Sequence, residues 1–130
     1  MRKNINKTLS LWVLILLWMV LISALSSIPG RHLPRFGFFG FDKVAHMAEY
    51  FVLGFLMIKA LFDSSKMALA KAVMICMLIA ALYAGVDEWH QSFVPDRKAD
   101  IADYIVDLIG LNIGIYIYIG SLKRKSEICR

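Results

Sequence analysis

The sequence predicts an all-α, polytopic membrane protein with four transmembrane helices and a short interfacial helix before the fourth. Hydrophobic residues make up 59% of the 130 residues, and the mean hydropathy is +0.63, above the usual range for a soluble domain. Only 19% of the residues are charged, and they cluster between apolar runs instead of covering helix faces. At this length we expect a single domain, residues 1–130.

Four apolar runs underlie this prediction, since a helix needs about 20 residues to cross the hydrocarbon core of a bilayer. The expected spans are residues 8–28, 44–62, 67–86 and 101–122. The interfacial helix is expected over residues 88–94, where Trp89 and Phe93 share one apolar side of a helical turn. Pro95 ends that turn.

The first span is interpreted as an uncleaved helix that ends at Pro29. Its apolar core, Leu9 to Leu25, is longer than that of a usual signal peptide. A signal peptide is the alternative interpretation, because the end of the span resembles a small-residue cleavage zone, formed by Ser23, Ala24, Ser26 and Ser27.

Basic residues flank the apolar runs, so the net charge of +5 reflects the positive-inside pattern and does not indicate a nucleic-acid partner. Ten of them fall on the side of the two termini: Arg2, Lys3, Lys7, Lys59, Lys66, Lys71, Lys123, Arg124, Lys125 and Arg130. Five fall on the other side: Arg31, Arg35, Lys43, Arg97 and Lys98. We therefore predict a multi-pass protein of the cell membrane with cytoplasmic N and C termini, whose loops 29–43 and 87–99 face outward.

Two polar segments are expected to meet at this outer face. The second helix starts there, the third ends there and the fourth starts there, so the beginning of the second span and the segment 87–103 lie at one depth. Four polar residues of the second span occupy positions i, i+4, i+7 and i+8, on one helix face. They are Asp42, His46, Glu49 and Tyr50.

The fourth span carries a second set of acids on one face. Asp100, Asp103 and Asp107 follow the spacing i, i+3 and i+7, which places Asp107 about 10 Å below Asp100 at 1.5 Å per residue. A carboxylate at that depth is expected to face the interior of the bundle. Gly110 and Gly114 form a GxxxG pair, which favours close approach of another helix.

Each polar residue also has a structural interpretation. Asp42 and Asp100 are suited to cap helices, Arg97 can pair with neighbouring acids, and His46 can be satisfied by Glu49. Together they are too numerous for caps, so we predict a binding site. The candidate ligand-binding residues are Asp42, Lys43, His46, Glu49, Tyr50, Glu88, Gln91, Arg97, Asp100, Asp103 and Asp107.

The two polar segments resemble motifs of the VanZ-like family. The first reads D-K-x-x-H-x-x-x-Y from Asp42 to Tyr50, and the second reads D-E-x-x-Q-x-F-x-P-x-R-x-x-D-x-x-D from Asp87 to Asp103. The resemblance covers about residues 8–120 and implies a small bacterial membrane protein whose namesake is associated with resistance to the glycopeptide antibiotic teicoplanin. It implies no catalytic residues. Where the family has Asn, this chain has Asp107.

The leading hypothesis is an outward-facing site for an anionic cell-envelope or lipid-linked molecule. Arg97 is expected to hold a phosphate or carboxylate, with Lys43 or Lys98 assisting. We expect four side chains to orient Arg97: Glu88, Gln91, Asp100 and Asp103. Acids outnumber bases in this set, which disfavours an anion unless a metal intervenes.

Two alternatives remain at this stage. One is a metal-dependent membrane hydrolase or transferase acting on a lipid-linked substrate, with a divalent metal held by carboxylates and imidazoles. The available ligands are Asp42, His46, Glu49, Glu88, His90, Asp100 and Asp103. The sequence has no GxSxG, HExxH or P-loop motif, so we favour a protein that is not an enzyme and assign no cofactor. The other alternative is a non-catalytic membrane interaction protein, and a homo-oligomer is left open.

Overall fold

The structure, a computed structural model, describes residues 2–32, 41–64 and 67–128. Its elements are α1 (Arg2–Ser26), the short 3-10 helix η1 (Gly30–His32), α2 (Phe41–Ser64), α3 (Leu69–Gln91) and α4 (Ile101–Ile128). These ranges contain no strand, and each of the four long helices is long and apolar enough to cross a membrane. The predicted all-α fold with four membrane spans is confirmed.

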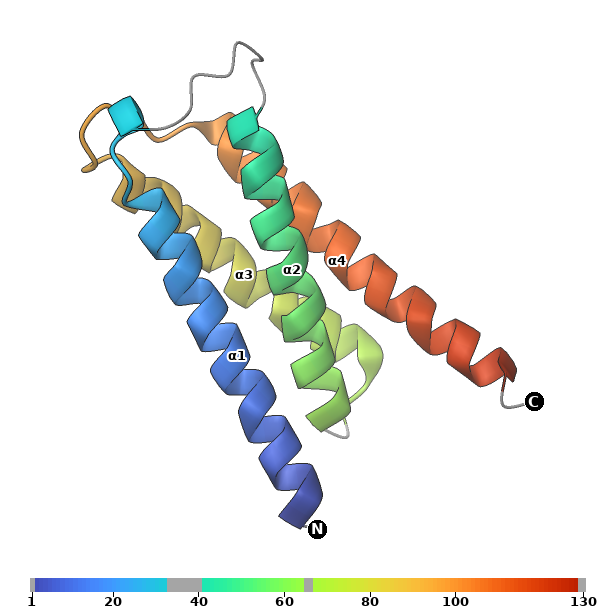
Figure 1. The fold of residues 1–130 in the computed structure, drawn as a ribbon. Helices are drawn as coiled ribbons and strands as arrows, with labels where there is room; N and C mark the ends of the chain where they lie inside the picture. Colours follow the sequence, from blue (N-terminus) through green and yellow to red (C-terminus); the bar gives the residue numbers. More distant parts are fainter. Residues whose placement is uncertain (1, 33–40, 65–66, 129–130) are drawn as a thin grey trace.

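Successive long helices run in opposite directions, so that the two termini lie toward one end of the bundle (Figure 1). The opposite end is formed by η1, the first turns of α2 and α4, the last turn of α3 and the connection 92–100 (Figure 1). We call it the polar end. α2 lies at the centre of the bundle, contacts the other three long helices and packs most extensively on α4.

The segment 88–94 does not form a separate interfacial helix, which corrects that part of the prediction. α3 continues to Gln91, because the first helix-breaking residue after Val86 is Pro95. The remaining residues of the segment form turns. Trp89 and Phe93 lie on the surface with an edge-to-face contact, their ring centroids 5.2 Å apart.

Glycines bring α2 and α4 into close contact. A Cβ atom on Gly110 would collide with the backbone carbonyl oxygen of Met47, and one on Gly114 would collide with that of Phe51. The GxxxG pair therefore packs against another helix as predicted.

Small side chains allow α3 to pack closely against α2. Ala72, Cys76, Ala80 and Ala84 recur every four residues along its buried face. Because these side chains are short, α3 can lie close to α2, and the Cys76 Sγ atom is 3.9 Å from the Gly54 carbonyl oxygen.

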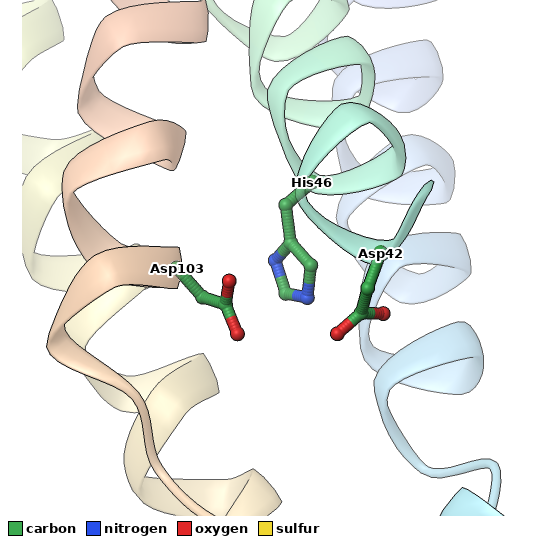
Figure 2. Close-up of side chains that lie close together, drawn as sticks. All are labelled: Asp42, His46 and Asp103. Carbon is green, nitrogen blue, oxygen red and sulfur yellow. The ribbon is translucent and has the colours of Figure 1, made fainter. Parts of the chain in front are cut away.

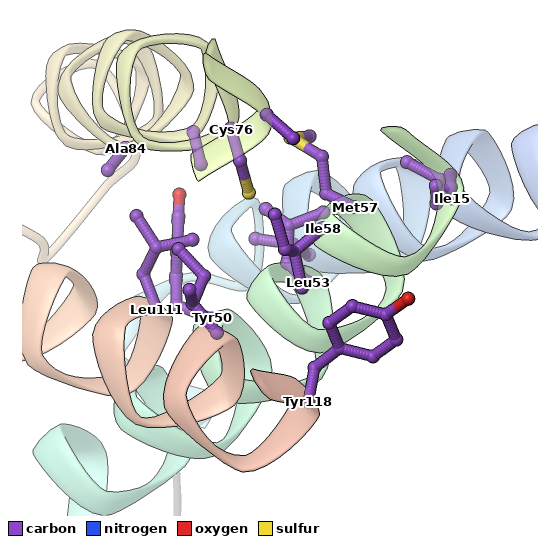
Figure 3. Close-up of a cluster of buried hydrophobic side chains, with 14 residues drawn as sticks. Ile15, Tyr50, Leu53, Met57, Ile58, Cys76, Ala84, Leu111 and Tyr118 are labelled. Carbon is purple, nitrogen blue, oxygen red and sulfur yellow. The ribbon is translucent and has the colours of Figure 1, made fainter. Parts of the chain in front are cut away.

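The apolar core surrounds α2, as Figure 3 shows. Its labelled members are Ile15, Tyr50, Leu53, Met57, Ile58, Cys76, Ala84, Leu111 and Tyr118. Large apolar side chains also point outward, among them Leu17 of α1, Leu82 of α3 and Ile117 of α4. Apolar residues on the inner and outer faces together are typical of helices that pack on one another and face lipid.

Candidate functional site

The buried helix faces that build the core continue into the polar end and become polar there. On α3, Glu88 follows the small-residue row that includes Ala84 by four positions. On α4, Asp107 and Asp103 share the buried face of Gly110 and Gly114. His46 stands one turn before Tyr50 on α2. The 3.6-residue period places these polar groups on the buried face of each helix, so that they lie close together where the helices pack.

A histidine and a carboxylate meet at the deepest point of this end. The Nδ1 atom of His46 lies 3.1 Å from Oδ1 of Asp107, and the two side chains are 5% and 0% exposed. The other oxygen of Asp107, Oδ2, has no hydrogen-bond partner among the described residues. A buried carboxylate in this state is costly unless a further group meets it.

Lys43 lies nearer the surface and forms ion pairs with two acids of α4. Its Nζ atom is 3.3 Å from Oδ2 of Asp100 and contacts Oδ1 of Asp103 at short range. Asp100 also caps α4, because its Oδ1 accepts the backbone N–H of Ala102 at 2.8 Å. These hydrogen bonds, first that of Ala102 and then that of Lys43, stabilise the carboxylate and lower the pKa of Asp100 below its ordinary value.

Glu88 connects the end of α3 to the start of α4. Its Oε2 atom accepts the backbone N–H of Asp100 at 2.9 Å. Its Oε1 atom is buried and has no partner within the described part of the chain. Glu88 therefore resembles Asp107 in having one oxygen engaged and one unsatisfied.

Two groups of three potential metal ligands share the ring of His46. Asp42, His46 and Asp103 form one group, and Figure 2 shows the imidazole between the two carboxylates. The other group joins His46 to Glu88 and Asp107. In each group one nitrogen or oxygen per residue lies within 4.8 Å of the others. The second group is buried throughout, whereas Asp42 of the first is exposed.

A separate network surrounds Arg97. Its Nε donates to the Ile28 carbonyl oxygen at 3.2 Å, and its Nη1 donates to Oε1 of Gln91 at 3.0 Å. The amide nitrogen of Gln91 donates to Asp87 at 3.2 Å and to the Ser26 hydroxyl at 3.2 Å. Ser26 in turn donates to Asp87 at 2.7 Å. This network fixes the connection after α3 to the end of α1.

A pocket of about 250 Å³ opens between the end of α3 and the start of α4. Glu88, Asp100 and Tyr104 line it together with Gly85, Ala99 and Ile101. Although three of these residues carry polar groups, the surface that faces the pocket is almost wholly apolar, which suits an apolar chain better than a charged headgroup.

The structure divides the predicted site residues into two networks. Seven lie in the network of α2, α3 and α4: Asp42, Lys43, His46, Glu88, Asp100, Asp103 and Asp107. Gln91 and Arg97 belong to the other network. Arg97 is thus oriented by Gln91, as expected, and by a backbone carbonyl, whereas Glu88, Asp100 and Asp103 have other partners.

Two predicted residues lie between or below these networks. Glu49 is half-buried and interacts electrostatically with His46, Asp87 and Arg97. Tyr50 is fully buried, and its hydroxyl has no hydrogen-bond partner among the described residues.

Sequence reasoning did not select Ser26 or Asp87 as site residues. Both are buried, and they form the inner part of the Arg97 network. The signal for Ser26 was present in the serines at the end of the first span, which were considered only as a cleavage zone. Asp87 follows Ala80 and Ala84 on the inward side of α3, so its spacing indicated burial.

Comparison with known proteins gives matches at the level of sequence. The family profile described as VanZ/LLP1 matches residues 8–124. An uncharacterised protein of Schizosaccharomyces pombe is 30% identical over 87 residues, which are 66% of this chain and 51% of that protein. The chain thus spans about half the length of this curated relative. No solved structure matches the chain.

Proposed function

We propose that this chain, which belongs to the VanZ/LLP1 family, binds the anionic headgroup of a lipid-linked molecule at its polar end. Arg97 carries the proposal. Its guanidinium is held by two neutral acceptors, Gln91 and the Ile28 carbonyl. Within the described residues no carboxylate lies within ion-pairing distance of it.

The charges of the polar end favour Arg97 over Lys43 as the anion ligand. Lys43 is already paired with Asp100 and Asp103. A guanidinium has five N–H donors in a planar fork, and the two bonds of Arg97 fix its plane. Its electrostatic interaction with the Glu49 carboxylate acts beyond ion-pairing distance. The remaining donors suit two oxygens of one phosphate or carboxylate. A half-buried cation held in this way gains most from an anionic ligand.

The position of Arg97 suits a ligand that arrives in the membrane. Its partners Ile28 and Gln91 stand at the ends of the first and third spans, where lipid headgroups begin. The excess of Lys and Arg on the side of the termini supports a topology with cytoplasmic termini and the polar end outside the cell membrane. The ligand is then an outer-leaflet molecule.

The resemblance to VanZ, with its association with teicoplanin resistance, makes a lipid-linked precursor of the bacterial cell envelope the narrower candidate. The match to a yeast protein extends the likeness beyond bacteria. Ordinary anionic phospholipids therefore belong among the ligands tested.

Lipid co-purification tests the proposal. The full chain is extracted in mild detergent, and bound lipids are identified by native mass spectrometry. We expect an anionic lipid on the wild type and at least about a tenfold loss of it for Arg97→Ala, since charge-assisted hydrogen bonds contribute about 1.5–3 kcal/mol. Arg97→Lys keeps the charge without the fork and should fall between the two.

Arg124→Ala is the control, because Arg124 is an exposed cation of the same type near the end of α4, away from the polar end. It should retain the lipid. Thermal unfolding of each variant separates lost binding from lost fold. Equal lipid occupancy of folded Arg97→Ala and wild type would refute the proposal.

A further inference from the structure

We propose that His46, Glu88 and Asp107 form a binding site for one divalent metal ion of the Zn²⁺ or Mn²⁺ class. A ring nitrogen of His46 and one carboxylate oxygen from each acid lie within 4.8 Å of one another. The three residues come from α2, α3 and α4, so the site exists only in the folded bundle. It is distinct from the anion site proposed above, because Arg97 is not among its ligands.

Unsatisfied buried oxygens point to a ligand at this position. Glu88 is 6% exposed and Asp107 is 0% exposed, and each has one oxygen without a hydrogen-bond partner among the described residues: Oε1 of Glu88 and Oδ2 of Asp107. Leaving such atoms unpaired away from water is costly. A cation bound between the two carboxylates would satisfy both.

Charge balance favours a divalent ion. Two carboxylates carry two negative charges, and a neutral imidazole adds none. The nearest lysine, Lys43, is already engaged by Asp100 and Asp103. A single divalent cation would neutralise the buried group, which suits its position within the membrane-spanning part of the helices.

The donor set indicates which ions fit. One imidazole and two carboxylates are typical ligands of Zn²⁺ and Mn²⁺, whereas Ca²⁺ and Mg²⁺ prefer oxygen alone. Ligand atoms about 2.1 Å from one ion are at most about 4.2 Å apart. The side chains therefore need only a small adjustment to close around it. Three protein ligands leave one coordination position for water or another molecule.

Two further acids lie beside the buried site. Asp42 is exposed and lies beside His46, with Asp103 on the other side of the ring (Figure 2). Acids at the mouth of a site raise the local concentration of cations. These two residues compete less well for the ion itself, because Asp103 is held by Lys43 and Asp42 faces solvent.

Direct metal binding by the full chain tests this inference. Protein without an affinity tag, carrying Cys129→Ser to remove a second thiol that could bind metal, is treated with chelator and titrated with Zn²⁺ and Mn²⁺ in detergent by calorimetry. We expect one ion per chain. Asp107→Asn and Glu88→Gln should each weaken binding by at least about tenfold, and Mg²⁺ should bind more weakly than either metal.

Asp96→Asn is the control, because Asp96 is an exposed acid of the same end and its positive φ of 60° also suits Asn. It should bind as the wild type does. Metal should raise the melting temperature of the wild type but not that of Asp107→Asn, a shift that shows both binding and an intact fold. Absence of binding by the wild type, or unchanged binding by Asp107→Asn and Glu88→Gln, would overturn the inference.

Discussion

Asp100 forms three polar contacts at the first turn of α4. Its backbone N–H donates to Glu88, its Oδ1 accepts from Ala102, and its Oδ2 pairs with Lys43. The first contact joins α4 to α3, and the last joins α4 to α2. One exposed acid therefore fixes the mutual position of three helices beside the candidate metal site.

The charge of Asp100 leads to a pH-dependent prediction. Because the pKa of Asp100 is lowered in the folded protein, its charge stabilises the fold fully above the unfolded pKa of about 3.9. That contribution is lost as the pH falls through the folded pKa. Asp100→Asn keeps the capping oxygen and removes the charge. The wild type should therefore melt at a higher temperature than Asp100→Asn from pH 8 to pH 5, and the difference should shrink below about pH 3.9.

Tryptophan fluorescence during heating, in one detergent across the pH series, measures this difference. A gap between the two proteins that widens on acidification would contradict the assignment of the charge to the Lys43 contact and the helix cap.

One face of α4 carries both the glycines that pack against α2 and two acids of the polar end. Gly110 and Gly114 allow close contact with α2, and Asp103 and Asp107 continue the same face into the polar end. The position of Asp107 beside His46 therefore depends on how closely the two helices approach. A substitution that separates α2 from α4 should therefore alter the contact between His46 and Asp107 without changing either residue.

Gly110→Ala tests this dependence. The added Cβ would collide with the Met47 carbonyl oxygen, a backbone atom that cannot turn aside. We expect destabilisation of about 1–3 kcal/mol, as for other overpacked sites, measured by thermal or denaturant unfolding in detergent. Gly120→Ala is the matched control on the same helix, because a Cβ there meets nothing within 4 Å. Equal stability of the two variants would show that the α2–α4 contact tolerates separation.

The helix ends that carry the two networks meet at one end of the molecule, and the termini lie toward the other (Figure 1). The proposed topology, which rests on the positive-inside bias, has both termini in the cytoplasm. A cysteine at Lys98, exposed at the polar end, should thus react with a membrane-impermeant maleimide added to intact cells. A cysteine at Ser126, exposed near the end of α4, should react only after permeabilisation.

The background for this labelling is Cys129→Ser, since Cys76 is fully buried. The reverse pattern, with Ser126→Cys labelled in intact cells and Lys98→Cys protected, would place the polar end in the cytoplasm and remove outer-leaflet molecules from the proposed ligands.

The sequence by itself determined the four helices and the convergence of their polar residues. Both depend on local properties: the length of each apolar run and the 3.6-residue period, which puts Asp103 and Asp107 on one face with Gly110. Because successive spans reverse direction, the starts of α2 and α4 and the end of α3 had to meet. The extension of α3 to Gln91 could also be found locally, from the position of Pro95.

Only the tertiary structure decided which polar residue meets which. The pairing of His46 with Asp107, and that of Arg97 with Gln91 and the Ile28 carbonyl, depends on the rotation and depth of each helix relative to its neighbours. Those are set by contacts between helices, such as the Gly110–Met47 approach. The period of a single helix contains no information about them, which is why one expected cluster became two networks.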